Sequence, residues 1–190
     1  MKPLRRYWDS NAFLGWLNRE PESVDACDGI IDEAKAGRCE IVTSTFTFAE
    51  VFWVRGVPLK SDQIHAIDQL FRHKWIIPAR LDRPTAELAR ELLQEFAQDD
   101  DLTPRDSVHL ASAIRARKLG GVVCFDTWDK KLHGFTGKLQ RVPSLNVKDS
   151  GSDLVIAIPT GQGRLFGATQ TGVSTGLSLP TLRSPGVEQA

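Results

Sequence analysis

Short apolar segments alternate with segments of helical periodicity up to about residue 148. The apolar segments are continuous rather than alternating in polarity, which is typical of strands that are buried on both faces. An alternation of strands and helices favours an α/β fold with a parallel sheet and right-handed crossovers. We expect strands at residues 4–8, 40–43, 75–77 and 121–125, with possible further strands at 140–142 and 154–158.

Helical periodicity and capping residues place the helices between these strands. The clearest begins at Thr103, which is followed by Pro104, and ends at Gly120-Gly121. Another, at residues 44–54, is apolar on almost every face and is therefore expected to be buried, with Glu50 as its one acidic residue. The remaining helices are expected at residues 12–17, 22–37, 61–71, 82–96 and 128–132.

The composition of the chain limits what it can bind and where it works. The 190 residues carry no net formal charge, so any nucleic-acid binding must come from a local patch. Cys27, Cys39 and Cys124 are far apart in the sequence and are expected to be free thiols in a reducing cytosol. No signal peptide and no apolar segment of membrane-spanning length is evident, which predicts a cytoplasmic protein without a membrane partner.

The composition changes at about residue 149. Residues 149–190 are rich in Gly, Ser, Thr and Pro and poor in charged residues. Such composition is typical of flexible segments. We therefore expect one domain at residues 1–148 and a flexible C-terminal tail at 149–190.

Acidic residues lie at or beside the expected carboxyl ends of the strands, where ligands bind in open α/β sheets. These residues are Asp9, Glu50, Asp106, Asp126 and Asp129. Each has a simple capping explanation. Asp9 could cap the helix at Ala12, residues 47–50 and 103–106 fit capping boxes, and Asp126 or Thr127 could cap the helix at 128.

Taken together, the acidic residues favour a metal site. An unpaired Glu50 inside an apolar helix would cost several kcal/mol on burial, and a divalent cation would offset that cost. Mg²⁺ and Mn²⁺ prefer oxygen ligands and keep waters that a phosphate can share. A metal ion there would polarise a phosphoryl oxygen and assist the attack of water, which indicates phosphodiester hydrolysis.

Four segments together resemble a PIN domain, with the strongest likeness to the VapC-type ribonuclease toxins of prokaryotic toxin–antitoxin pairs. The resemblance covers residues 4–147, and its most specific part is the sequence D-S-V-H-L-A-S-A that begins at Asp106. The segments are residues 9–11, 48–51, 105–113 and 127–132.

The resemblance implies a three-layer α/β/α sandwich and cleavage of RNA with one or two Mg²⁺ or Mn²⁺ ions. Asp9 and Asp106 would be the principal metal ligands, and Glu50 would support the site. For the fourth acidic position, Asp129 fits the family spacing, because Thr127 precedes it and Leu132 follows it.

The sequence also allows other assignments. Asp126 lies nearer the strand end than Asp129 and is a second candidate, and Ser10 or Thr127 could add a hydroxyl. Basic residues near the acidic ones, such as Arg105 and Lys131, could position RNA phosphates or be ordinary solvated charges. The fold could also carry an inactive RNA- or protein-binding module, or a DNA nuclease. The resemblance further suggests a homodimer and a cognate antitoxin whose basic side chain enters the acidic pocket.

Overall fold

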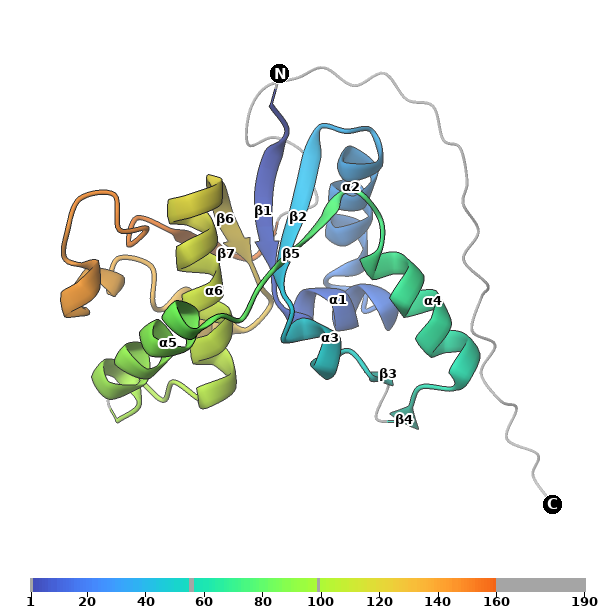
Figure 1. The fold of residues 1–190 in the computed structure, drawn as a ribbon. Helices are drawn as coiled ribbons and strands as arrows, with labels where there is room; N and C mark the ends of the chain where they lie inside the picture. The colour runs from blue at the N-terminus through green and yellow to red at the C-terminus, as the bar shows by residue number, and fades with distance from the viewer. Residues whose placement is uncertain (1, 55–56, 99, 160–190) are drawn as a thin grey trace.

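The architecture is a parallel sheet between two layers of helices, as the sequence predicts (Figure 1). It is described by a computed structural model that covers residues 2–54, 57–98 and 100–159. The five strands lie in the order β5-β2-β1-β6-β7, and every neighbouring pair is parallel. Their bounds are Leu4–Trp8 (β1), Cys39–Ser44 (β2), Ile76–Ala79 (β5), Val122–Asp126 (β6) and Val155–Ala157 (β7).

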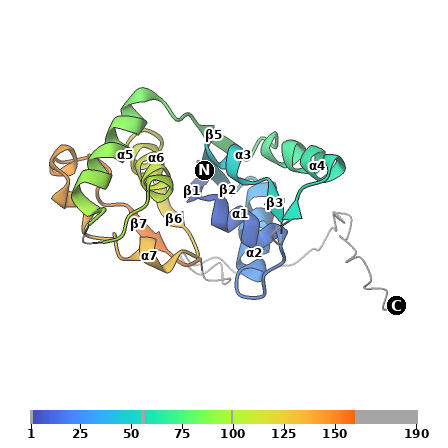
Figure 2. The same ribbon diagram turned by 90° about the horizontal axis from the view of Figure 1, so that it is seen from below.

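Helices cover both faces of the sheet, with α5 and α6 on one side and α1, α2 and α4 on the other (Figure 2). A small antiparallel pair, β3 with β4, follows α3. The helices are α1 (Ser10–Leu17), α2 (Val24–Lys35), α3 (Thr47–Glu50), α4 (Ser61–Phe71), α5 (Arg83–Phe96), α6 (Pro104–Gly120) and α7 (Lys130–His133). The short elements are β3 (Trp53–Val54), β4 (Val57–Pro58) and the 3-10 helices η1 (Leu139–Arg141) and η2 (Pro143–Leu145). Within the described ranges, no helix is both long enough and apolar enough to span a membrane.

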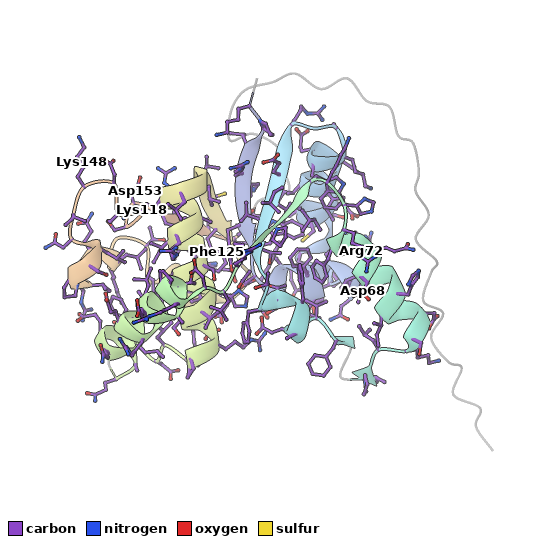
Figure 3. All side chains as sticks on the ribbon, viewed as in Figure 1. Asp68, Arg72, Lys118, Phe125, Lys148 and Asp153 are labelled. Atoms are coloured by element: carbon purple, nitrogen blue, oxygen red, sulfur yellow. The ribbon has the colours of Figure 1, made fainter. Side chains whose placement is uncertain are left out.

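Two hydrophobic cores lie on opposite faces of the sheet, because consecutive residues of a strand point to opposite sides. In β1, Tyr7 belongs to the core under α5 and α6, and Trp8 belongs to the core under α1 and α2. Phe125 of β6 packs against Tyr7 with 4.9 Å between ring centroids, and Figure 3 shows it between α6 and the strands. Each core holds its layer of helices against the sheet.

The strand order reverses at β1. The chain first moves outward from β1 to β2 and β5, and then returns to the other side of β1 for β6 and β7. The carboxyl ends of β1 and β6 therefore lie side by side at the switch point, where ligands bind in sheets of this kind. In Figure 1 this edge is at the bottom of the sheet, near α3 and the amino end of α6.

Two sequence-based expectations of secondary structure differ from the structure. The helix expected at 44–54 is wrong, because α3 has four residues and Val51 leaves helical geometry at ψ 66°. Phe48 and Phe52 on this segment are 40% and 48% exposed, so apolar composition here does not mean burial. The strand expected at 140–142 is also wrong. Leu139 and Val142 are both fully buried, and their three-residue spacing matches a 3-10 turn.

The further strand considered at 154–158 is confirmed, and it lies within the segment expected as a tail. Strand β7 forms within the segment 154–158 and pairs with β6, so the sheet continues beyond residue 148. The side-chain hydroxyl of Thr136 bonds both the N–H and the C=O of Ile156 at the outer edge of β7. This contact protects an edge strand that would otherwise present unpaired backbone groups. Residues 160–190, the larger part of the expected tail, lie outside the described residues.

Candidate active site

Asp9 follows β1 directly and is 2% exposed. One carboxylate oxygen accepts a hydrogen bond from the backbone N–H of Ala12 at 2.9 Å, so Asp9 caps α1 as the sequence suggests. The other oxygen accepts from the hydroxyl of Thr127 at 2.6 Å. Burial raises the pKa of Asp9, while the charge of His109 and these two hydrogen bonds act in the opposite direction. A cation beside this carboxylate would relieve the cost of burying its charge.

Thr127 connects Asp9 to Asp129 across the switch point. Its hydroxyl donates to Asp9 and also accepts from the backbone N–H of Asp129 at 3.1 Å. Asp129 caps α7, because its carboxylate accepts from the N–H of Lys131 at 2.9 Å. The cap is therefore Asp129, not Asp126 or Thr127. The negative charge of Asp129 contributes to the raised pKa of Asp9, so the two carboxylates repel each other.

Asp106 lies in the first turn of α6, where the sequence places it. The Thr103 side chain accepts from the N–H of Asp106 at 3.2 Å and donates to its carboxylate at 2.6 Å. This pair begins the helix and fixes the orientation of the Asp106 side chain. Lys131 forms an ion pair with Asp101, which raises the pKa of Lys131, and Asp129 and Asp106 add to that effect. Asp106 in α6 and Asp129, which caps α7, therefore both act electrostatically on Lys131.

Glu50 ends α3 and is surrounded by cationic or potentially cationic groups. One carboxylate oxygen is 2.6 Å from Nε2 of His109, and the other forms an ion pair with Nε of Arg105. Burial opposes ionisation, but the hydrogen bond to His109 and the charges of His109 and Arg105 lower the pKa of Glu50 overall. The capping box expected at residues 47–50 does not form, because Thr47 bonds the hydroxyl of Thr43 and caps no helix.

Sequence reasoning missed the network behind Glu50. His109 is 2% exposed, and its Nδ1 lies 3.1 Å from the hydroxyl of Tyr7, which is fully buried in β1. Arg105 donates from Nη2 to the hydroxyl of Ser10 at 2.8 Å, next to Asp9. The spacing of Arg105 and His109 around Asp106 was a signal for this network, because residues three or four apart share a helix face. Nothing in the sequence indicated Tyr7.

Asp126 does not face the other acidic residues. It is fully buried, and its two oxygens each lie 2.6 Å from a guanidinium nitrogen of Arg6. Trp8 donates an indole N–H to the same carboxylate at 3.1 Å. Asp126 was a candidate ligand because it lies near the strand end. These bonds occupy both of its oxygens inside the protein, whereas Asp129 is partly exposed.

The oxygen donors at this edge have the chemistry that Mg²⁺ or Mn²⁺ requires. In the part of the chain that the structure describes, no three His, Cys, Asp or Glu side chains are grouped closely enough to hold a metal ion. Mg²⁺ is commonly held by only one or two carboxylates and completes its shell with water and substrate oxygens. Asp9, with its buried carboxylate and raised pKa, fits that mode of binding together with Asp129 or Asp106.

Comparison with known proteins identifies one family. The model described as PIN domain matches residues 6–134, which is more than half of the chain. The match extends from β1 to the end of α7 and includes all five acidic residues discussed above. No curated protein matches the chain.

Proposed function

Because the chain belongs to the PIN domain family, whose members are generally metal-dependent nucleases, we propose that it is an endoribonuclease that uses Mg²⁺ or Mn²⁺. The observation that carries the proposal is the link from buried Asp9 through Thr127 to Asp129. This link lies at the switch point of the sheet. Capping alone does not require it, because Asp9 and Asp129 each cap a helix with a single oxygen.

In this proposal Asp9 would hold the ion together with Asp106 or Asp129, and water and substrate oxygens would complete its shell. When bound, the ion supplies Lewis-acid polarisation of a phosphoryl oxygen and lowers the pKa of water. The protein contributes orientation. Thr127 fixes one oxygen of Asp9, and Thr103 fixes the carboxylate of Asp106, so neither side chain must be ordered when RNA binds.

The proposal is tested by cleavage of a mixed-sequence, single-stranded RNA. We expect the purified protein to cleave it with Mg²⁺ or Mn²⁺, to stop when EDTA is added, and to resume when the metal is restored. Asp106→Asn is the matched variant, because asparagine keeps the shape of the side chain but removes its charge. Equal cleavage by the wild type and this variant, or cleavage that persists in EDTA, would show that the assignment is wrong.

An inactive RNA-binding module is the second candidate. It is favoured by the absence of a grouped set of three metal ligands among the described residues. This candidate predicts that RNA binds without turnover and that Mn²⁺ binds weakly. Calorimetric titration with Mn²⁺, together with the cleavage assay, separates it from the first.

We further propose that the protein is the toxin of a toxin–antitoxin pair and works as a homodimer on RNA in the cytoplasm. This part rests on the resemblance of the sequence around Asp106 to VapC-type toxins. The antitoxin would place a basic side chain in the acidic pocket. A short open reading frame directly upstream of the gene would support it, and expression of the protein alone should arrest growth of the host cell.

The Thr127 hydroxyl offers a separate prediction. Thr127→Val has nearly the same shape but cannot bond Asp9 or Asp129, so we expect cleavage to fall roughly tenfold, in line with the loss of a hydrogen bond to a charged group. Thr127→Ser keeps the hydroxyl and should retain most of the activity. The measurement is the initial rate at fixed Mg²⁺ for both variants. Equal rates for valine and serine would mean that the hydroxyl does not orient Asp9.

A further inference from the structure

Arg105 is held at the rim of the acidic edge by side chains from two other elements, Ser10 of α1 and Glu50 of α3. We propose that Arg105 binds a backbone phosphate of the RNA, and that Glu50 and His109 are positioning residues that hold its guanidinium in place. This inference rests on the proposed function for its substrate class. It differs from the sequence-based expectation, in which Glu50 supports the metal ion.

The contacts form a continuous chain from the core to the surface. The Tyr7 hydroxyl lies 3.1 Å from Nδ1 of His109, and Nε2 of His109 lies 2.6 Å from Glu50. The other oxygen of Glu50 forms the ion pair with Arg105, and Arg105 donates to Ser10. Tyr7 and His109 are almost completely buried, so this chain anchors the otherwise exposed Arg105 to the centre of the sheet.

Oε2 of Glu50 is bonded to His109, whereas Oε1 is buried and lies in an ion pair with Arg105 without making a hydrogen bond to any described residue. A metal ion bound directly to Glu50 would have to displace Arg105, because Oε2 is engaged by buried His109. The displaced guanidinium of Arg105 would then lie next to a divalent cation without its carboxylate partner, which is electrostatically unfavourable. The side chain of Glu50 is 10% exposed, so its ion pair with Arg105 is largely shielded from solvent.

Glu50 also needs this network for its own placement. It ends a four-residue helix that has no side-chain cap, and Val51 then leaves helical geometry. Such a short segment has little stability of its own. The side-chain bonds to His109 and Arg105 therefore fix where α3 lies, and the same bonds fix the guanidinium.

The guanidinium has donors to spare for a phosphate. Its Nε faces Glu50 and its Nη2 donates to Ser10, while half of the side-chain surface is exposed. Arginine carries five N–H donors in a planar fork that matches the oxygens of a phosphate. The acidic residues nearby would repel RNA, and a cation fixed by Ser10 and Glu50 offsets that repulsion where the RNA backbone must approach.

The first experiment measures RNA binding. A fluorescein-labelled, mixed-sequence, single-stranded RNA is titrated by anisotropy, with Ca²⁺ as the divalent ion and RNA integrity checked on a gel. We expect Arg105→Ala to weaken binding roughly tenfold. The slope of log Kd against log salt should fall by about 0.7, the value for one phosphate contact on a single strand.

A lysine variant shows whether RNA binding needs the planar guanidinium of Arg105 or only its charge. Arg105→Lys keeps the charge but cannot span Glu50 and Ser10, so we expect it to restore less than half of the lost binding free energy. Arg38→Ala is the matched control, because Arg38 pairs with Glu33 at the amino end of β2, on the opposite edge of the sheet. It should bind RNA as the wild type does. Full rescue by lysine, or equal losses for the alanine variants of Arg105 and Arg38, would overturn the proposal.

The anchoring role of Glu50 has its own readout. Loss of a negative charge alone would tighten RNA binding, but loss of the anchor should weaken it, so Glu50→Gln is expected to weaken binding. Calorimetry should give the same Mn²⁺ affinity for this variant as for the wild type, whereas Asp106→Asn should lower it. Unchanged or tighter RNA binding by Glu50→Gln, or a lower Mn²⁺ affinity, would contradict the positioning role.

His109→Gln tests the link to the core. Glutamine can still donate to Glu50 but cannot reach both Glu50 and Tyr7, and circular dichroism checks that the variant folds. We expect a weaker RNA affinity than the wild type, and no additional loss when His109→Gln is combined with Arg105→Ala. Additive losses in the double variant would mean that His109 does not act through Arg105.

The two proposals fail in different ways. If the wild type binds RNA through Arg105 but never cleaves it with Mg²⁺ or Mn²⁺, the nuclease proposal is wrong and this inference holds. If it cleaves RNA and Arg105→Ala binds RNA as tightly as the wild type, only this inference is wrong. If it neither binds nor cleaves RNA, both are wrong.

Discussion

Replacing Asp129 by asparagine is expected to lower the rate of RNA cleavage by roughly a hundredfold or more. A bound ion supplies several kcal/mol of transition-state stabilisation, and each 1.36 kcal/mol corresponds to about a factor of ten in rate. The substitution should leave the fold intact, because asparagine caps helices about as well as aspartate and can still accept from the N–H of Lys131. A large loss of rate with little change in stability identifies Asp129 as a residue of the site.

Asp126→Asn is the matched comparison, and we expect it to lower the stability of the fold rather than the rate of cleavage. Asp126 forms a buried ion pair with Arg6, and loss of one charge leaves the other uncompensated. Removing one partner of a buried pair typically costs about 3–5 kcal/mol of stability. The initial cleavage rate per folded molecule should stay near that of the wild type, measured below the unfolding transition with the folded fraction determined by circular dichroism. If Asp126→Asn loses the rate and Asp129→Asn keeps it, the fourth acidic position has been assigned to the wrong residue.

Local signals made much of the fold predictable. The helix at Thr103 was placed correctly, because its cap, the following proline and the final glycine all act within a few residues. Thr103 does cap α6, and Gly121 ends it with a φ of +69°. The α/β class followed from continuous apolar segments, since such strands must be covered on both faces. The positions of Asp9 and Asp106 then followed from the ends of these elements.

What the sequence could not predict depends on contacts between distant residues. Arg6 and Asp126 pair because β1 and β6 are neighbours, and nothing in the sequence indicates a pairing of two residues that lie 120 positions apart. The same holds for Glu50 and His109, which are 59 residues apart. The expected helix at 44–54 failed for a related reason. Its apolar residues pack against other elements or lie at the surface, and periodicity alone cannot distinguish these cases from burial within a helix.

The Arg6–Asp126 pair gives the second large prediction, which concerns stability alone. The pair holds the two central strands together beneath the switch point, with the Arg6 side chain 18% exposed and the Asp126 side chain fully buried. Burial opposes the charge of Arg6, but the hydrogen bonds and charge of Asp126 raise its pKa overall, so the guanidinium stays protonated. Arg6→Met keeps a similar length but removes the positive charge, and we expect it to lower the free energy of unfolding by about 3–5 kcal/mol.

The double variant Arg6→Met/Asp126→Leu should recover most of this loss, because it leaves no unpaired buried charge and adds apolar contacts. The indole N–H of Trp8 loses its acceptor, at a cost of about 1–3 kcal/mol, and the thiol of Cys124 loses a weaker one. Equilibrium unfolding in urea measures all of the variants, and Arg38→Ala serves as the control for an exposed ion pair, expected to change stability by less than about 1 kcal/mol. If the double variant were less stable than Arg6→Met alone, the pair would contribute net stability through its own geometry. We expect instead that each charge is required only because the other is buried beside it.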